Sequence, residues 1–339
     1  MRQSCNYNRG KNRMKLRNLI IAVLAIMCPI AVLFSVGVGA VQYNYLEVLN
    51  AIFDADSKAR LIIFELRFPR TLAAGMVGVC LSLSGCILQG IMRNSLASPS
   101  TIGVTSGASF VGYMTLVVFP ASAHLLPIGS IVGAFSTTLL IYALAYRKGV
   151  SPVKMILSGM AVSSLFGAFN DMIRTVFADK LGDAVGFLVG GLNGVVWDEV
   201  RMLLPYMVVG ILATFILPAR LNILALGDET ANSLGLQTER FRFILICISS
   251  LLAGAAIAAA GMISFVGLMV PHLARLMVGS DYRKLFPASA FLGFFVVVMC
   301  DAIGRIVMAP SEVPVSVIMS FIGAPFFLYL LRSRGEVKG

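Results

Sequence analysis

Charged side chains are scarce in this 339-residue sequence: Asp, Glu, Lys and Arg make up 13% of the residues, about half the share usual in soluble domains. Hydrophobic residues make up 58%, and the mean hydropathy is +0.89. A water-soluble surface of this size could not accommodate so many apolar groups. The composition therefore excludes a soluble globular protein and indicates a polytopic membrane protein.

Several kinds of reactive site are also missing from the sequence. No stretch matches the phosphate-binding pattern GxxxxGK[ST], and the two histidines, His124 and His272, lie far apart without metal-ligand spacing. The cysteines show no metal or redox spacing and mostly lie in apolar runs, as expected of small core residues; they are Cys5, Cys28, Cys80, Cys86, Cys247 and Cys300. We expect no ATP hydrolysis by the chain alone, no bound metal and no cofactor.

Apolar runs fill most of the chain, and ten of them approach or exceed the about 20 residues that a helix needs to cross a bilayer. The third and eighth runs are short and rich in Gly and Pro, so broken or tilted helices are expected there. The sequence predicts an all-α membrane protein of about ten transmembrane helices. The spans lie near residues 19–40, 68–92, 100–119, 125–145, 153–176, 201–218, 241–261, 263–279, 285–308 and 314–331.

The basic residues collect before the first span and in every second gap, which predicts a cytoplasmic position for both termini. A basic tail (1–18), one transmembrane domain (19–332) and a C-terminal tail (333–339) are expected. This topology accounts for the net charge of +11 without nucleic-acid binding. The run at 19–40 exceeds the core of a signal peptide, so we expect it to be an uncleaved helix.

Two segments are organised without being clear spans. Residues 41–66 mix apolar and charged side chains in a pattern suited to a helix lying on the outer surface. Residues 182–198 carry glycines at four-residue spacing together with Trp197, which favours a partial helix packed near the outer face. Whether this second segment spans the membrane is left open by the sequence.

Two pairs of opposite charge lie within the predicted spans. Asp171 and Arg174 are three residues apart, and Asp301 and Arg305 are four apart, so each pair can neutralise itself along one helix. Structural neutralisation and a functional role are both compatible with this spacing.

The longest cytoplasmic loop, residues 218–242, contains its own short helical pattern. Asp228 is placed to cap the N-terminus of this helix and Gly235 to end it. Ala231 and Leu234 would share a face of little bulk, which suits docking into a groove of a partner. A plain loop helix is the alternative.

Short motifs follow one another in a specific order over roughly residues 19–332. The first half contains Arg67-Phe-Pro-Arg70-Thr-Leu, Ser84-Gly85 with Gln89, Arg93-Asn-Ser-Leu-Ala-Ser-Pro99, Ile102-Gly103 and Gly107-Ala108. The second half contains Leu226-Gly-Asp-Glu-Thr-Ala231 with Leu234-Gly235, Ile263-Ser-Phe-Val-Gly-Leu-Met-Val-Pro-His-Leu-Ala-Arg275, Asp301 with Arg305, Glu312-Val-Pro-Val315 and Gly323-Ala-Pro-Phe326. Each motif is weak alone, but together they closely resemble the FecCD-type permeases of ABC importers, which carry ferric siderophores, haem or cobalamin.

The resemblance implies an assembly in the lipid bilayer of a bacterial cytoplasmic (inner) membrane. It consists of a homodimer of ten-helix subunits with a path along the dimer axis, two cytoplasmic ATP-binding subunits and an extracytoplasmic substrate-binding protein. The missing ATP site of this chain agrees with such a division of labour.

The resemblance also implies roles for individual residues. Arginines on the outer face of these permeases receive acidic residues of the binding protein, and the matching positions are Arg67, Arg70 and Arg305. Guanidinium groups at an exposed rim are well suited to steer and align a carboxylate-bearing partner. The alternative for Arg67 and Arg70 is that they only anchor the span at the lipid headgroups.

The element that couples such permeases to their ATPase corresponds to Gly227, Asp228, Glu229, Ala231, Leu234 and Gly235. Asn94 and Leu96 fall where these permeases narrow the cytoplasmic end of the path, and Gln89 lies nearby. Ser95 departs from the usual Asn-Pro-Leu-Ala pattern, which puts the gate geometry in doubt. His272 follows Pro271 in a signature that we interpret as structural.

The function expected from these features is that of a permease subunit, not an enzyme, which passes a ferric siderophore or similar metal chelate inward by ATP-driven alternating access. The alternatives are an ion-coupled secondary transporter that acts without an ATPase, and a polytopic membrane enzyme. The ligand stays open between siderophore, haem, cobalamin and oxyanion.

Overall fold

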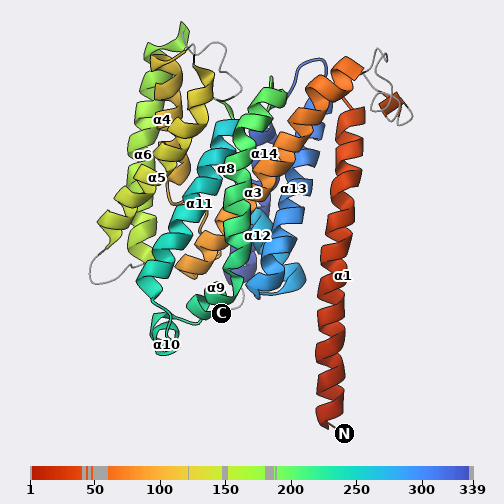
Figure 1. Cartoon of the computed structure of the whole chain (residues 1–339), viewed down its shortest axis with the longest axis vertical. Helices are drawn as coiled ribbons and strands as arrows, with labels where there is room; N and C mark the ends of the chain where they lie inside the picture. The colour runs from red at the N-terminus through yellow and green to blue at the C-terminus, as the bar shows by residue number, and fades with distance from the viewer. Residues whose placement is uncertain are drawn as a thin grey trace.

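The computed structural model describes residues 2–39, 43–44, 47–48, 60–120, 122–146, 152–179, 187 and 189–335, and this part of the chain is a bundle of helices (Figure 1). A π-helical turn, Leu61–Arg67, leads directly into α3, and a 3-10 turn, Ala123–Leu125, leads into α5. The α-helices are α1 (Arg2–Gly37), α3 (Phe68–Met92), α4 (Val104–Val118), α5 (Leu126–Ala145), α6 (Pro152–Val176), α8 (Trp197–Ile216), α9 (Pro218–Ala225), α10 (Asp228–Ser233), α11 (Thr238–Ala260), α12 (Val266–Val278), α13 (Tyr282–Val307) and α14 (Val315–Gly335).

Each of the ten predicted spans falls on one of these helices. Seven helices, counted among the described residues, are long and apolar enough to cross a membrane; they include α1 from Met14 and α3 together with its π-helical turn. The helices α4, α12 and α14 are apolar but shorter. Two of these, α4 and α12, correspond to the third and eighth predicted spans, which the sequence indicated as short and as broken or tilted. The number of ten transmembrane helices stays a prediction.

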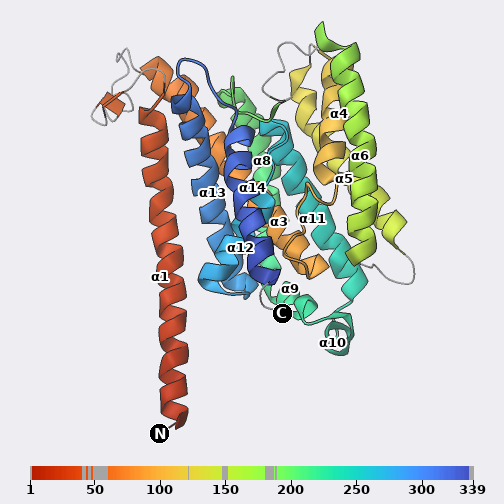
Figure 2. The same cartoon turned by 180° about the vertical axis from the view of Figure 1, so that it is seen from behind.

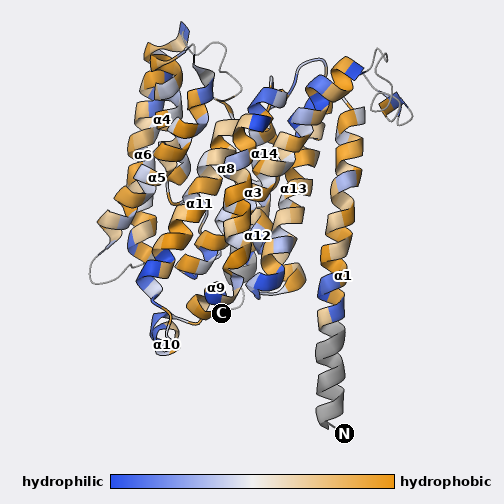
Figure 3. Cartoon of the chain, in the orientation of Figure 1, coloured by the Kyte–Doolittle hydropathy of each residue, from blue (hydrophilic) through white to orange (hydrophobic). Residues whose placement is uncertain are grey.

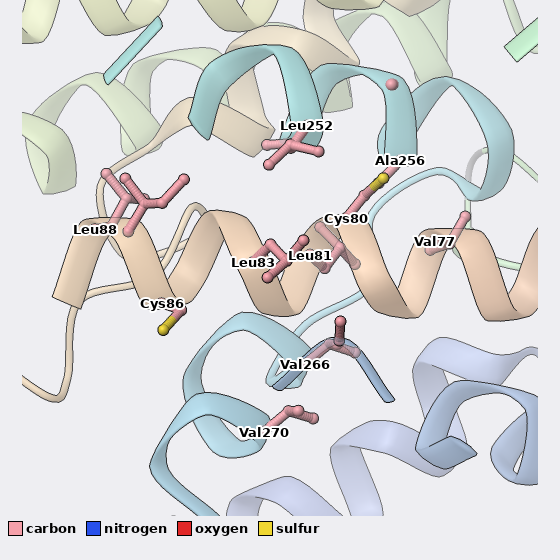
Figure 4. Packing of buried hydrophobic residues seen from close by; sticks show 14 of the residues in the cluster. Val77, Cys80, Leu81, Leu83, Cys86, Leu88, Leu252, Ala256, Val266 and Val270 are labelled. Carbon is pink, nitrogen blue, oxygen red and sulfur yellow. The ribbon is translucent and has the colours of Figure 1, made fainter. Parts of the chain in front are cut away.

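Helix α3 lies at the centre of the bundle, against α11, α12 and α13 (Figures 1 and 2). Figure 4 shows Val77, Cys80 and Leu83 of α3 among side chains of α11 and α12. Nearly all residues of α3 are buried, because the helix is apolar on every side. The core of the protein is therefore built around this one helix.

Two glycines let α3 approach its neighbours at backbone distance. A Cβ placed on Gly78 would overlap the carbonyl of Gly293 on α13, and one on Gly85 would overlap the carbonyl of Gly267 on α12. Small residues at such crossings allow close packing between membrane helices. Any larger side chain at these positions must push two backbones apart.

The two ends of the bundle differ from its middle in polarity. The middle of the helices is hydrophobic, and hydrophilic residues gather at both ends (Figure 3). The two marked chain ends and the helices α9 and α10 lie at one end, which we name the α10 end (Figures 1 and 2). The opposite end, where α13 stops and α14 starts, is named the far end. The predicted placement of both termini and the 218–242 loop on one side agrees with this arrangement; which side is cytoplasmic stays a prediction.

Helix α1 stands along α13 and presents an apolar outer surface. Leu19, Ile26 and Ile30 are each more than half exposed. Because no described element covers them, such side chains suit contact with lipid tails.

The two segments without clear spans are only partly described. Of residues 41–66, the last part from Arg60 belongs to the helical run that enters α3, and most of the rest lies outside the described residues. Of residues 182–198, positions 182–186 and 188 lie outside the described residues, and Trp197 already starts α8. Whether that segment enters the membrane stays open.

Candidate functional site

At the far end, Arg70 of α3 is the centre of an ion-pair cluster. Its Nη2 donates to Asp301 Oδ1 at 2.9 Å, its Nε reaches Asp301 Oδ2 at 3.2 Å, and its Nη1 donates to Glu312 Oε2 at 2.7 Å. Such bidentate contacts are among the stronger hydrogen bonds in proteins. The Asp301 side chain is only 1% exposed, so its charge depends on the neighbouring guanidinium groups.

Arg305 and Arg67 join this cluster to the end of α1. The Arg305 Nε lies 3.2 Å from Asp301 Oδ2, and its Nη2 donates to the Ser35 carbonyl at 2.8 Å. The Arg67 Nη1 donates to the Val36 carbonyl at 3.0 Å. The last carbonyls of a helix lack internal partners and carry partial negative charge, so two arginines both satisfy and stabilise the end of α1.

All three predicted docking arginines thus come together, and they border one cavity of about 440 Å³ with Glu312. Arg67 is 8% and Arg305 3% exposed, so they line the inside of the far end and do not stand on an exposed rim. The predicted pair of Asp301 and Arg305 is confirmed. The contact of Arg70 with Glu312 joins residues 242 positions apart, which no sequence spacing could have indicated.

The second predicted pair is also formed. Arg174 Nη1 lies 3.7 Å from Asp171 Oδ1, and its Nη2 donates to the Tyr113 hydroxyl at 2.6 Å. Arg174 borders a hollow of about 770 Å³ between the last turns of α6 and the first half of α14, which also exposes Ser316 and Ser320. Sequence reasoning missed this hollow, because single serines in apolar helices carry no recognisable pattern.

A second hollow of about 550 Å³ continues along the same two helices toward the α10 end. It is bordered by Asn94, Leu96 and Met160, with Phe327 of α14. Phe265 stands between the two hollows: its neighbour Ser264 borders the first, and Phe265 itself borders the second. Together the two hollows follow the α6–α14 face, whose large apolar residues Met160 and Phe321 are more than half exposed.

The predicted gate residues lie at the end of α3 and in the turn after it, residues 93–99, which we name the gate segment. The Leu96 amide donates to Asn94 Oδ1 at 2.9 Å, which holds the turn in shape. Gln89 is buried and donates from Nε2 to the Leu268 carbonyl at 3.2 Å. The structure therefore brings Asn94 and Leu96 together at one hollow and places Gln89 in the neighbouring helix packing.

At the α10 end, the predicted coupling residues lie in the short helix α10 or directly beside it. Their arrangement differs in two ways from the one that the sequence predicted. Gly227, at φ 115°, is the N-cap residue, and Asp228 makes no capping bond. The Asp228 carboxylate pairs instead with Arg242, so the predicted cap is wrong. Gly235, at φ 80°, follows the helix as expected.

The predicted shared face of Ala231 and Leu234 is wrong as well. Ala231 is fully buried, whereas Leu234 is 61% exposed. The Leu236 amide donates to the Ala231 carbonyl at 3.0 Å, which folds the end of α10 back onto Ala231. Within α10, Glu229, Thr230, Asn232 and Ser233 are exposed, and the flanking Leu226 and Leu234 add exposed apolar side chains beside them.

Arg242 of α11 holds α10 in place, and sequence reasoning assigned it no role beyond topology. Its side chain is 2% exposed, with Nη2 at 2.9 Å from Asp228 Oδ1 and Nη1 at 2.8 Å from Glu239 Oε1. Glu239 in turn accepts from the Tyr142 hydroxyl of α5 at 3.0 Å. The signal for this role in the sequence is Arg242 itself, a basic residue that follows the acidic Glu239 by three positions in the first turns of α11.

A second polar contact fixes α9 to the start of α13. Asn222 Nδ2 donates to Asp281 Oδ1 at 2.7 Å, and the Tyr282 amide donates to Asn222 Oδ1 at 3.0 Å. Partial burial would raise the pKa of Asp281, but the bonds from Asn222 and the Arg283 amide, with the nearby positive charges, hold that pKa below its usual value.

The described part of the chain contains no group of three or more His, Cys, Asp and Glu side chains that could hold a metal ion. His272 is buried against Phe326, with ring centroids 6.2 Å apart. The chemistry available at these places is therefore that of ion pairs, hydrogen bonds and apolar surfaces.

Known proteins resemble the chain over almost its whole length. The Fe(3+)-citrate import system permease protein YfmE of Bacillus subtilis is 35% identical, with 93% of this chain and 95% of that protein covered. The iron(3+)-hydroxamate import system permease protein FhuB of Bacillus subtilis is 39% identical over 93% of this chain and 83% of its own length. A solved structure, described as an inward-facing conformation of a metal-chelate type ABC transporter, is 30% identical with a TM-score of 0.82 and covers 93% of this chain and 99% of its own. Because the FecCD transport family also matches residues 26–333, this multi-pass membrane protein belongs to that family.

Proposed function

We propose that the chain is the permease subunit of a binding-protein-dependent ABC importer, which passes a ferric siderophore or a similar metal chelate into the cytoplasm by ATP-driven alternating access. The observation that carries this proposal is membership of the FecCD transport family over residues 26–333. Relatives named for ferric citrate and ferric hydroxamate support an iron chelate as cargo. The assembly proposed is a homodimer in a bacterial inner membrane with two ATP-binding subunits.

The path for the chelate is the α6–α14 face. Its two hollows, of about 770 and 550 Å³, are large enough for parts of a chelate. Their walls are mostly apolar, with serines and one cation, Arg174, so they offer few strong contacts. Such weak binding suits a cargo that must be released on the other side of the membrane, because strong contacts would slow its release. A second copy facing this surface would close the path, with Asn94 and Leu96 as its gate.

The coupling element is α10 with its flanking glycines, residues 227–235. Glu229 and Leu234 are exposed and available to a partner, while Asp228 and Ala231 are held by the rest of the protein. A force applied to Glu229 and Leu234 therefore passes into α11 through the contact of Asp228 with the buried Arg242. Gly227 and Gly235 define where the element begins and ends.

The docking site for the binding protein is the arginine cavity at the far end. A carboxylate that enters the cavity can replace Glu312, which is 34% exposed, on Arg70. Asp301 keeps its two guanidinium partners during such an exchange. This model requires the incoming acid to enter the far end and not only to touch its surface.

Reconstituted vesicles test the proposed function. Vesicles that hold this chain alone should take up no ferric citrate or ferric hydroxamate. Uptake should appear when the ATP-binding subunits, the binding protein and ATP are all supplied, and omission of any one of them should abolish it. Uptake by the chain alone on a proton or sodium gradient would refute the proposal in favour of an ion-coupled transporter.

A further inference from the structure

A separate polar cavity of about 400 Å³ lies at the α10 end. It shares Asn94 with the hollow of about 550 Å³ but is otherwise formed by other residues, from the end of α3, the gate segment, the end of α9, the end of α12 and the start of α13. Gln89, Arg93, Ser95, Arg275 and Tyr282 are among them. Apart from Asn94, the cavity shares no lining residue with the two hollows of the α6–α14 face.

The charge around this cavity has one sign. Arg93 and Arg275 border it, and no Asp or Glu side chain does. Arg93 forms only a long ion pair with Asp228, at 4.0 Å between partly exposed side chains, and that carboxylate makes its closer contact with Arg242 at 2.9 Å. Among the described residues, the wall of the cavity thus carries two guanidinium groups and no carboxylate.

Arg275 is the more enclosed of the two cations. It has no acidic partner among the described residues, and its Nε is buried without a hydrogen bond. Its Nη2 reaches Gln89 Oε1 only at 3.4 Å, and its guanidinium lies over the Tyr282 ring at 5.7 Å. A partly buried cation that is not paired costs free energy unless an anion joins it. The arrangement suits a bound anion better than an empty space.

The gate segment adds a hydrogen-bond donor. Ser95, the residue that departs from the usual proline, borders the cavity, and its Oγ is buried without a partner. A serine hydroxyl that turns into a cavity lined by two arginines can donate to an oxyanion that both cations attract. Proline at this position could not do so.

We propose that this cavity binds an oxyanion, the carboxylate or phosphate group of a small ligand, through Arg275, Arg93 and the hydroxyl of Ser95. The volume admits phosphate, citrate or the headgroup of an anionic lipid. Occupation would draw Arg93 toward the cavity and away from Asp228, and so would change the contact between the gate segment and α10. The binding itself does not depend on the proposed transport function.

Binding can be measured on the purified full-length chain in a neutral detergent. The midpoint of thermal unfolding is recorded against sodium phosphate and sodium citrate, with sodium chloride at matched ionic strength as the reference. A saturable rise with phosphate or citrate is expected. Arg275→Gln should weaken the apparent affinity at least about tenfold, and Ser95→Ala about threefold. The matched control is Arg240→Gln, which removes an exposed arginine at the same end and should leave the affinity unchanged.

A lipid arm identifies the source of the anion. In phosphatidylcholine nanodiscs, phosphate or citrate should still raise the midpoint of thermal unfolding. If that rise is lost in discs that also contain phosphatidylglycerol, a lipid headgroup occupies the same site. If Arg275→Gln does not fold, the same titrations on Arg275→Lys, Arg93→Gln and Ser95→Ala show whether these side chains bind the anion. A response identical with chloride, or identical in these variants and the wild type, would overturn the proposal.

Discussion

Replacing Arg242 by methionine measures how firmly α10 is attached to the bundle. Arg242 is 2% exposed and contacts Asp228 and Glu239 at 2.9 and 2.8 Å, whereas those two carboxylates are 39% and 41% exposed. A hydrogen bond to a charged group contributes about 1.5–3 kcal/mol when both sides are buried. Here the freed carboxylates regain water, so we use about 1 kcal/mol for each contact. Methionine retains much of the apolar stem, which leaves a loss of about 2 kcal/mol in the attachment of α10.

Proteolysis of the loop reports this attachment directly. A protease specific for glutamate cleaves after the exposed Glu229 only when α10 opens, and the rate follows the population of the open form when reclosing is fast. A loss of about 2 kcal/mol corresponds to cleavage about 30-fold faster. Arg240→Met is the matched control, because Arg240 is exposed and, within the described part of the chain, its polar contact is a hydrogen bond to the nearby Gln237 at 3.0 Å and not an ion pair.

Equal cleavage rates for Arg242→Met and Arg240→Met would refute this reasoning, because α10 would then be held by packing around Ala231 and not by the ion pairs. Faster cleavage only at sites outside residues 218–242 would also contradict it, since the destabilised region would then lie elsewhere in the protein.

Three further changes test other parts of the molecule. Arg67→Glu together with Arg70→Glu should weaken capture of the binding protein and spare association with the ATP-binding subunits, as pull-down of each partner measures; unchanged capture would remove both residues from the docking site. Gly85→Ala should destabilise the bundle by about 3 kcal/mol, seen as a lower thermal midpoint, because the new Cβ meets the Gly267 backbone, whereas Gly167→Ala has open space inside α6 and should not lower the midpoint. Because the folded-state pKa of Asp281 is lowered from 3.8, its stabilising effect is present above that value and is lost as the pH falls through the lower folded-state pKa; the thermal midpoints of wild type and Asp281→Asn should therefore differ at pH 6 and converge in stronger acid.

The helices themselves followed from the sequence because lipid imposes one simple rule on the backbone. Every amide inside the hydrocarbon core must be bonded within its own segment, so each long apolar run becomes a helix. The starts differ where polar residues continue the helix: α3 is preceded by the π-helical turn Leu61–Arg67, and α8 begins at Trp197 and not at residue 201. Apolar length predicts the span and not the full extent of the helix.

The candidate sites were less accessible to prediction, because their geometry depends on contacts between distant segments. Spacing of four residues was sufficient for Asp301 with Arg305, but no local spacing could predict the pair of Arg70 with Glu312. The error at Asp228 has the same cause. The predicted capping bond joins neighbouring residues, whereas the Asp228 carboxylate instead accepts a hydrogen bond from the buried Arg242, 14 residues away. Local rules failed where a long-range ion pair offered the stronger contact.

One helix links the two ends that the proposed function needs to connect. Arg67 and Arg70 stand at the start of α3 and Gln89 at its end, and a helix of 25 residues spans about 37 Å. Backbone contacts at Gly78 and Gly85 fix α3 against α13 and α12, so it cannot bend locally without moving them. We therefore expect a change at the arginine cavity to reach the gate segment as a displacement of α3 with its two neighbours. Gly78→Ala, which would separate α3 from α13, should then weaken the dependence of ATP hydrolysis on the binding protein more than it weakens assembly with the ATP-binding subunits.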